Sequence, residues 1–219
     1  MPVDLSGLSK ADSEDFLGRL STYEMDASAV HQEELVVSPS SRVYLSMAAT
    51  RPSLIKPRIL ETHDLAKVKR WIGVPDRIFD RRVLPSRMPI SRFPLPSMLR
   101  AQPELLRGIE AGSMAEILRR IDPARLTSED RDNVLQAARA YVRGDSRLVA
   151  TYEPLVEAVI SVFRIPIWIF VTVKVQAGSV LEFGPGANVL AAWRVIIEEG
   201  GTIRSHGSLT LNCTHLEKV

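Results

Sequence analysis

The side chains best suited to chemistry lie in the last part of the sequence. Cys213 and His215 are two residues apart, which places a thiol and an imidazole on one face of a strand. With His206 a few residues earlier, they could hold a metal ion or form a Cys–His nucleophile pair. The spacing matches no established zinc pattern, and a lone buried cysteine commonly behaves as a small apolar residue. We therefore expect no metal site, with Cys213 in the core and the histidines on the surface.

Carboxylates offer a second route to catalysis, but their spacing is unfavourable. No aspartate follows Asp145, and the counterpart of Glu182 in the repeat described below is Ser205. The repeat therefore supplies no adjacent pair of the kind that glycoside hydrolysis needs. Nucleophile-elbow, Walker, Rossmann and His-Glu-x-x-His motifs are absent, so we expect no catalytic residues and no cofactor. The alternative is a small enzyme with a site in a groove of the C-terminal β unit, which would use Glu182, His206, Cys213 or His215.

These candidates lie in or near residues 170–215, a stretch that matches itself at an offset of 23 residues. In this match Val173 falls on Ile196, and Val180 falls on Ile203. Two apolar β-forming segments per copy, separated by glycine turns, are typical of stacked β-solenoid rungs. The alternative is an antiparallel meander with Gly-Gly and Gly-Pro-Gly turns.

The elements that would position this stretch are mixed and then helical. Amphipathic periodicity and capping residues predict helices, and alternation predicts short strands. The expected helices are 10–20, 62–71, 103–120, 127–143 and 148–163, and the expected strands are 35–37 and 42–47. This order predicts an α+β fold, in which a mixed or helical N-terminal region precedes a C-terminal β-solenoid-like unit (a short β-helix) or an antiparallel β unit.

Composition shifts divide the chain into four expected regions. An extended, Arg/Pro-rich segment separates the mixed region from the helical one, because each proline removes a backbone donor and disfavours helix before it. The regions are 1–75 (mixed α/β), 76–100 (Arg/Pro-rich strap or linker), 101–163 (helical) and 164–219 (C-terminal β unit).

Charge is distributed unevenly along the chain. Residues 1–50 carry three basic and eight acidic side chains, whereas residues 51–107 carry thirteen basic and five acidic ones. Arginines neutralise phosphates, so the basic strap is a candidate nucleic-acid contact. Aromatic residues are sparse among its arginines, and pairing of the strap with the acidic arm explains both charge blocks. We therefore do not favour nucleic acid as a partner. The candidate contacts of the strap are Arg81, Arg82, Arg87 and Arg92.

The last apolar segment, residues 209–216, suggests a different kind of site. If residues 170–215 form stacked strands, this segment lies at an edge whose backbone groups lack a partner. A second copy of the chain or an extended peptide could add a strand there, unless the strands near residues 35–37 or 43–47 return to cover it. We predict a non-enzymatic binding or assembly protein that presents this edge or groove to a protein or peptide. The expected edge residues are Leu209, Leu211, Cys213 and His215.

The expected environment is the cytoplasm. One cysteine, Cys213, permits no intramolecular disulfide, which fits a reducing compartment. The uninterrupted apolar run 165–173 is shorter than the roughly 20 residues that cross a bilayer. The first residues show no signal-peptide pattern. We therefore expect a soluble protein with no membrane partner.

Overall fold

A computed structural model describes residues 5–48, 50, 51, 53, 55–80, 93–102 and 111–219. The chain forms two compact units, each of which is considered by itself. One unit combines Met1–Glu61 with Arg164–Val219, and the other is Thr62–Phe163. The first unit contains both sheets and the candidate sites, so the fold is described from there.

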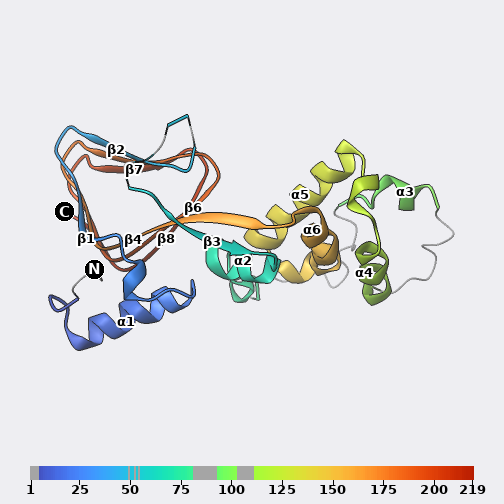
Figure 1. Cartoon of the computed structure of the whole chain (residues 1–219), viewed down its shortest axis with the longest axis horizontal. Helices are drawn as coiled ribbons and strands as arrows, with labels where there is room; N and C mark the ends of the chain where they lie inside the picture. The colour runs from blue at the N-terminus through green and yellow to red at the C-terminus, as the bar shows by residue number, and fades with distance from the viewer. Residues whose placement is uncertain (1–4, 49, 52, 54, 81–92, 103–110) are drawn as a thin grey trace. The chain divides into compact units, whose positions relative to one another are not determined.

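Two sheets of parallel strands face each other in the first unit (Figure 1). The strand order of the larger sheet is β1-β4-β6-β8, with β3 pairing with β4, and that of the smaller sheet is β2-β5-β7. The strands of the larger sheet are β1 (Gln32–Val37), β3 (Arg58–Thr62), β4 (Phe163–Val175), β6 (Ala187–Ile197) and β8 (Ser208–Lys218). Those of the smaller sheet are β2 (Arg42–Leu45), β5 (Val180–Phe183) and β7 (Thr202–Ser205).

The apolar core lies between these sheets. Trp168 of the larger sheet packs edge to face against Phe183 of the smaller one, with ring centroids 5.6 Å apart. Both side chains are fully buried, and aliphatic side chains from both sheets surround them. Burial of this apolar surface is the main force that holds the sheets together. The buried side chains around the two rings are Leu35, Val37, Leu45, Phe170, Val173, Val175, Leu181, Leu190, Ala192 and Val195.

Helix α1 (Lys10–Ser21) covers the outer face of the larger sheet (Figure 1). Its buried side chains, Phe16 and Leu20, lie on the face that the apolar stripe predicted. Ser9 caps the helix by accepting a hydrogen bond from the amide of Asp12, as its side chain predicted. The central strands of the larger sheet have apolar contacts on both faces. Their sequences are therefore nearly continuous apolar runs, which is typical of parallel strands.

The expected α+β fold class, with a C-terminal β-solenoid-like or antiparallel unit, is wrong. The protein is α/β, with parallel strands in two sheets and six α-helices in the described part of the chain. Strand β1 pairs in parallel with β4, and β2 pairs in parallel with β5. The sheets are therefore not a C-terminal β-helix of two repeats, because strands from the first fifty residues complete them. Such pairing joins distant segments, and local periodicity does not report it.

The register predicted by the internal match is also wrong by one residue. Val173 pairs with Val195 rather than Ile196, and Val180 pairs with Thr202 rather than Ile203. A slip of one residue exchanges the two faces of a strand, so the observed register is the one that stacks buried side chains on one another. The turn glycines account for the difference. Gly178 and Gly200 both have positive φ, at 66° and 73°, and Gly201, on which the match relied, does not.

The second unit, Thr62–Phe163, is helical. Thr127 and Asp130 form the expected capping box of α5, and the helix ends before Gly144 as predicted. The cap of α2 is Asp64, which accepts from the amide of Lys67 at 2.8 Å, rather than the expected Thr62. The helices are α2 (Leu65–Ile72), α3 (Ser97–Arg100), α4 (Ala111–Arg119), α5 (Ser128–Arg143) and α6 (Glu153–Val159).

The expected long helix 148–163 is shorter than predicted. Two 3₁₀ turns, Ser146–Leu148 and Ala150–Tyr152, precede α6, and Pro154 lies in its first turn as predicted. Residues 103–110 of the expected helix 103–120 lie outside the described residues. The predicted division of the chain at 76–100 likewise falls partly outside them and stays a prediction.

Candidate binding sites at the two ends of the sheets

The first candidate site is the β7–β8 end of the two-sheet unit. Strand β8 is last in the order of the larger sheet, and β7 is last in the smaller one. Within the described residues, no strand pairs with the far edge of either. The N-terminal strands β1 and β2 lie at the opposite end of both sheets, so they do not cover this edge.

Apolar side chains lie between the two free edges. Leu209, Leu211 and Cys213 are half-buried against the core, as is Ile203 of β7. Burial raises the pKa of the Cys213 thiol, which keeps it protonated at neutral pH. Its environment is that of a small apolar residue at the end of a core. Three of the four predicted edge residues therefore share one face.

The fourth predicted edge residue, His215, lies elsewhere. Its ring is exposed and packs edge to face against Trp193, with centroids 5.2 Å apart, whereas Cys213 packs against the core. The expectation that Cys213 and His215 share a face is therefore wrong. Along β4, the side chains that face the core have even numbers up to Phe170 and odd numbers from Val173 onward. Through the intervening strand β6, Phe170 aligns with Cys213 and Val173 aligns with Leu216. Strict alternation does not continue across that step.

The outer face of β8 already has a partner, helix α1. Asn212 accepts a hydrogen bond from Arg19 at 3.2 Å and donates one to the Tyr23 hydroxyl at 3.1 Å. Thr214 donates a hydrogen bond to Asp15 at 2.5 Å. These contacts fix the position of the strand, so its edge is a preformed surface.

The structure brings together Glu182 and His206, two of the candidates for the alternative enzyme site, although the internal match aligned Glu182 with Ser205. Nε2 of His206 contacts Oε1 of Glu182, and Nη1 of Arg42 lies 3.3 Å from Oε2. The hydrogen bond from His206 and the charge of Arg42 outweigh burial and lower the pKa of Glu182, which is therefore ionised at neutral pH. Oε2 makes no hydrogen bond with any described residue.

This cluster provides a buried carboxylate beside an imidazole, a pair that can move protons. Cys213 and His215 are not part of the cluster, and no group of three His, Cys, Asp or Glu side chains among the described residues could hold a metal ion. The arrangement is an ion-paired surface of the smaller sheet.

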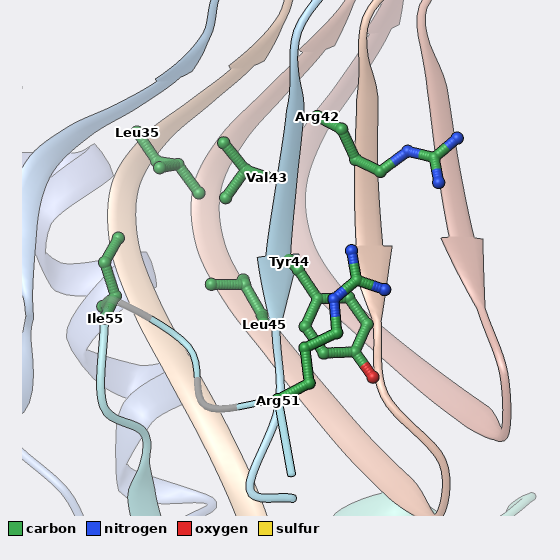
Figure 2. A pocket seen from close by; sticks show the side chains of 7 residues that line it. All are labelled: Leu35, Arg42, Val43, Tyr44, Leu45, Arg51 and Ile55. Carbon is green, nitrogen blue, oxygen red and sulfur yellow. The ribbon is translucent and has the colours of Figure 1, made fainter.

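The second candidate site is a pocket of about 340 Å³ at the β1–β2 end. Figure 2 shows apolar side chains on one side of β2, with Arg42, Tyr44 and Arg51 on the other. The sequence pattern predicted only a strand at 42–47 and did not predict this site. The available signal was its alternation, which places Val43 and Leu45 inward and Arg42 and Tyr44 outward.

Arg81, Arg82, Arg87 and Arg92 lie outside the described residues. Within the described residues, no helix combines the length and apolar character needed to cross a bilayer.

Comparisons of this chain with protein-family models, with curated proteins and with solved structures yield no match.

Proposed function

We propose that this chain is a non-enzymatic assembly protein that joins a second copy of itself through its β7–β8 end. The observation that carries the proposal is that both sheets end there, with half-buried apolar side chains between the two free edges. We keep the cytoplasm as the proposed compartment because the single cysteine fits a reducing environment.

Free strand edges favour association. Strand β8 spans Ser208–Lys218, and an edge of this length offers a row of backbone donors and acceptors to a new strand. Natural edges are often protected by proline, bulges or inward charges, and the inward residues Leu209, Leu211 and Cys213 provide none of these. Adding a strand would also remove these side chains from water.

A second copy fits this end better than a single peptide does. A peptide strand could pair with β8 or with β7, but not with both. A second copy presents two edges with the same separation and the same apolar strip. Two-fold symmetry places β8 against β8 and β7 against β7, in a contact that closes as a dimer.

The opposite end is less suited to this contact. There Ile55 packs against the core, and its carbonyl oxygen accepts a hydrogen bond from Trp168 at 3.0 Å. The segment that contains Ile55 therefore partly covers the core at the β1–β2 end. Arg42 and Arg51 also lie there and would repel Arg204, an outward residue of β7, in a head-to-tail stack.

Light scattering with matched variants tests the proposal. The native chain should have twice the monomer mass, and Leu211→Asp should be a folded monomer by circular dichroism. Ile203→Asp tests the smaller sheet separately and should have the same effect. Leu135→Asp replaces an exposed leucine of α5 and should leave the dimer intact. A monomeric native chain, or a folded Leu211→Asp dimer, would contradict the proposal.

A small enzyme is the second candidate, favoured by the contact between Glu182 and His206. In that case Glu182→Gln and His206→Ala would abolish turnover of a substrate that the native chain converts, while leaving the mass in solution unchanged. Assembly without any change of substrate by the native chain would favour the non-enzymatic proposal.

A further inference from the structure

The pocket at the β1–β2 end combines two kinds of surface. Its volume is about 340 Å³, near the lower end of the range of roughly 300–1,000 Å³ that is usual for small-molecule sites. It is lined by Leu35, Arg42, Val43, Tyr44, Leu45, Arg51 and Ile55 (Figure 2).

One side of the pocket is apolar. Leu35 of β1 and Leu45 of β2 are buried members of the core, and Val43 and Ile55 pack against the same core while remaining partly accessible. A ligand that covers the accessible parts of Val43 and Ile55 would gain from apolar burial. An ion without an apolar part would gain nothing from them.

The other side carries an excess of positive charge. The guanidinium group of Arg51 lies 4.0 Å from the centroid of the Tyr44 ring. Such stacking orients a guanidinium group without neutralising it. Arg42 shares the carboxylate of Glu182, whose other oxygen contacts His206. Two guanidinium groups therefore stand near a single carboxylate.

The geometry points to a ligand with an apolar body and a carboxylate group. We propose that the β1–β2 pocket binds a small amphipathic monocarboxylate, with its chain or ring on Val43 and Ile55 and its carboxylate on Arg51 and Arg42. Arginine suits this role because its planar fork of donors matches the two oxygens of a carboxylate.

The alternation of β2 connects the two halves of such a ligand. Val43 and Leu45 point into the core, and Arg42 and Tyr44 point outward, so a single molecule lying across the strand touches both surfaces (Figure 2). An alkylammonium ion would meet like charges, and the matching alcohol would lack the charge that the arginines recognise. The site is independent of the proposed assembly surface, because β1 and β2 lie at the other end of the sheets.

Calorimetric titration with octanoate tests this inference. Octanoate should bind, whereas octanol and octylammonium should bind at least about tenfold more weakly, since a lost charged contact of about 1.4 kcal/mol corresponds to tenfold. Inorganic phosphate serves as the probe for a site that recognises charge alone. Phosphate binding as tight as that of octanoate would overturn the proposal.

Two arginine substitutions test whether octanoate binds in this pocket. Arg51→Gln should weaken octanoate at least about tenfold, because Arg51 is exposed and its removal leaves the core intact. Arg204→Gln is the matched control, an exposed arginine on the outer face of the same sheet that does not line the pocket. Equal binding by the native chain and Arg51→Gln, or an equal loss in Arg204→Gln, would refute the assignment. Absence of octanoate binding at millimolar concentration would also refute it.

Discussion

The indole nitrogen of Trp168 donates a hydrogen bond to the carbonyl oxygen of Ile55, 3.0 Å away. Trp168 is fully buried at the centre of the core, whereas Ile55 lies in the segment 55–57 and lines the pocket together with Arg51. This bond therefore ties the wall of the pocket to the core. It also provides a partner for a buried donor that would otherwise be costly.

Replacement of Trp168 by phenylalanine should release this segment. The variant loses both ring volume and the hydrogen bond, so its free energy of unfolding should fall by about 2–4 kcal/mol in urea titrations. Amide exchange at Ile55 and Lys56 should accelerate. Phe183→Leu, which reduces the facing ring without removing a hydrogen bond, should lower stability but leave amide exchange at Ile55 and Lys56 nearly unchanged. Equal acceleration in both variants would show that the bond does not hold the segment.

Substitution by alanine should have opposite effects on stability at two glycines. A methyl group at Gly207 would meet the backbone of Gly186, whose amide nitrogen lies 2.6 Å from the Cβ position, so Gly207→Ala should lose at least about 2 kcal/mol. Gly18 lies inside α1, and outside its chain neighbours and the backbone of that helix no atom lies within 4 Å of a new Cβ. Gly18→Ala should therefore gain up to about 1 kcal/mol from helix propensity. Thermal unfolding of both variants checks the pair, and a stable Gly207→Ala protein would contradict the close approach of the two turns.

His31 should make stability fall on mild acidification. Its Nδ1 accepts from the amide of Ile169 at 3.0 Å, and its Nε2 lies 2.8 Å from the carbonyl oxygen of Lys56. The ring is therefore neutral, with its proton on Nε2. Burial lowers the pKa of His31 despite these backbone contacts. Because folding lowers the pKa of His31, its contribution to the free energy of unfolding is fully present above the pKa of an unfolded histidine, about 6.5. This contribution declines as the pH falls below that pKa.

The test is the free energy of unfolding between pH 7.5 and about pH 5, the interval in which an unfolded histidine gains its proton. The native chain should lose stability across this interval. His31→Gln should be less stable at pH 7.5 but should show a smaller slope. An unchanged slope in this variant would assign the pH dependence to other groups.

Features that depend on neighbours in sequence were predictable. The cap at Ser9 and the capping box of Thr127 and Asp130 are local hydrogen bonds, and both are confirmed. The cap of α2 was missed by two residues because Thr62 and Asp64 are both good capping residues, and only the structure distinguishes them.

Features that depend on distant pairing were not predictable. The glycine pattern supported an offset of 23, but the stacked turns of Gly178 and Gly200 fix the observed register. The pairing of β1 with β4 leaves no local signal, because the partners are separated by more than a hundred residues. For the same reason, the contact between Glu182 and His206 followed only from the correct register.

The same distinction between local and distant contacts applies to the two candidate sites. The apolar face of β8 could be predicted because Leu209, Leu211 and Cys213 alternate within one segment. The pocket could not be predicted, since it requires Ile55 and Leu35 to meet β2 in space.

The pairing of β3 with β4 has a consequence for the architecture of the whole chain. Glu61 and Arg164 form an ion pair of 2.9 Å, although the entire helical unit lies between them in sequence. The chain thus leaves and re-enters the two-sheet unit at neighbouring points. In the terms of protein engineering, residues 62–163 are an insertion that could be removed in one piece. A short flexible linker from residue 61 to residue 164 would close a small loop at low entropic cost and should leave a minimal protein that contains both candidate sites.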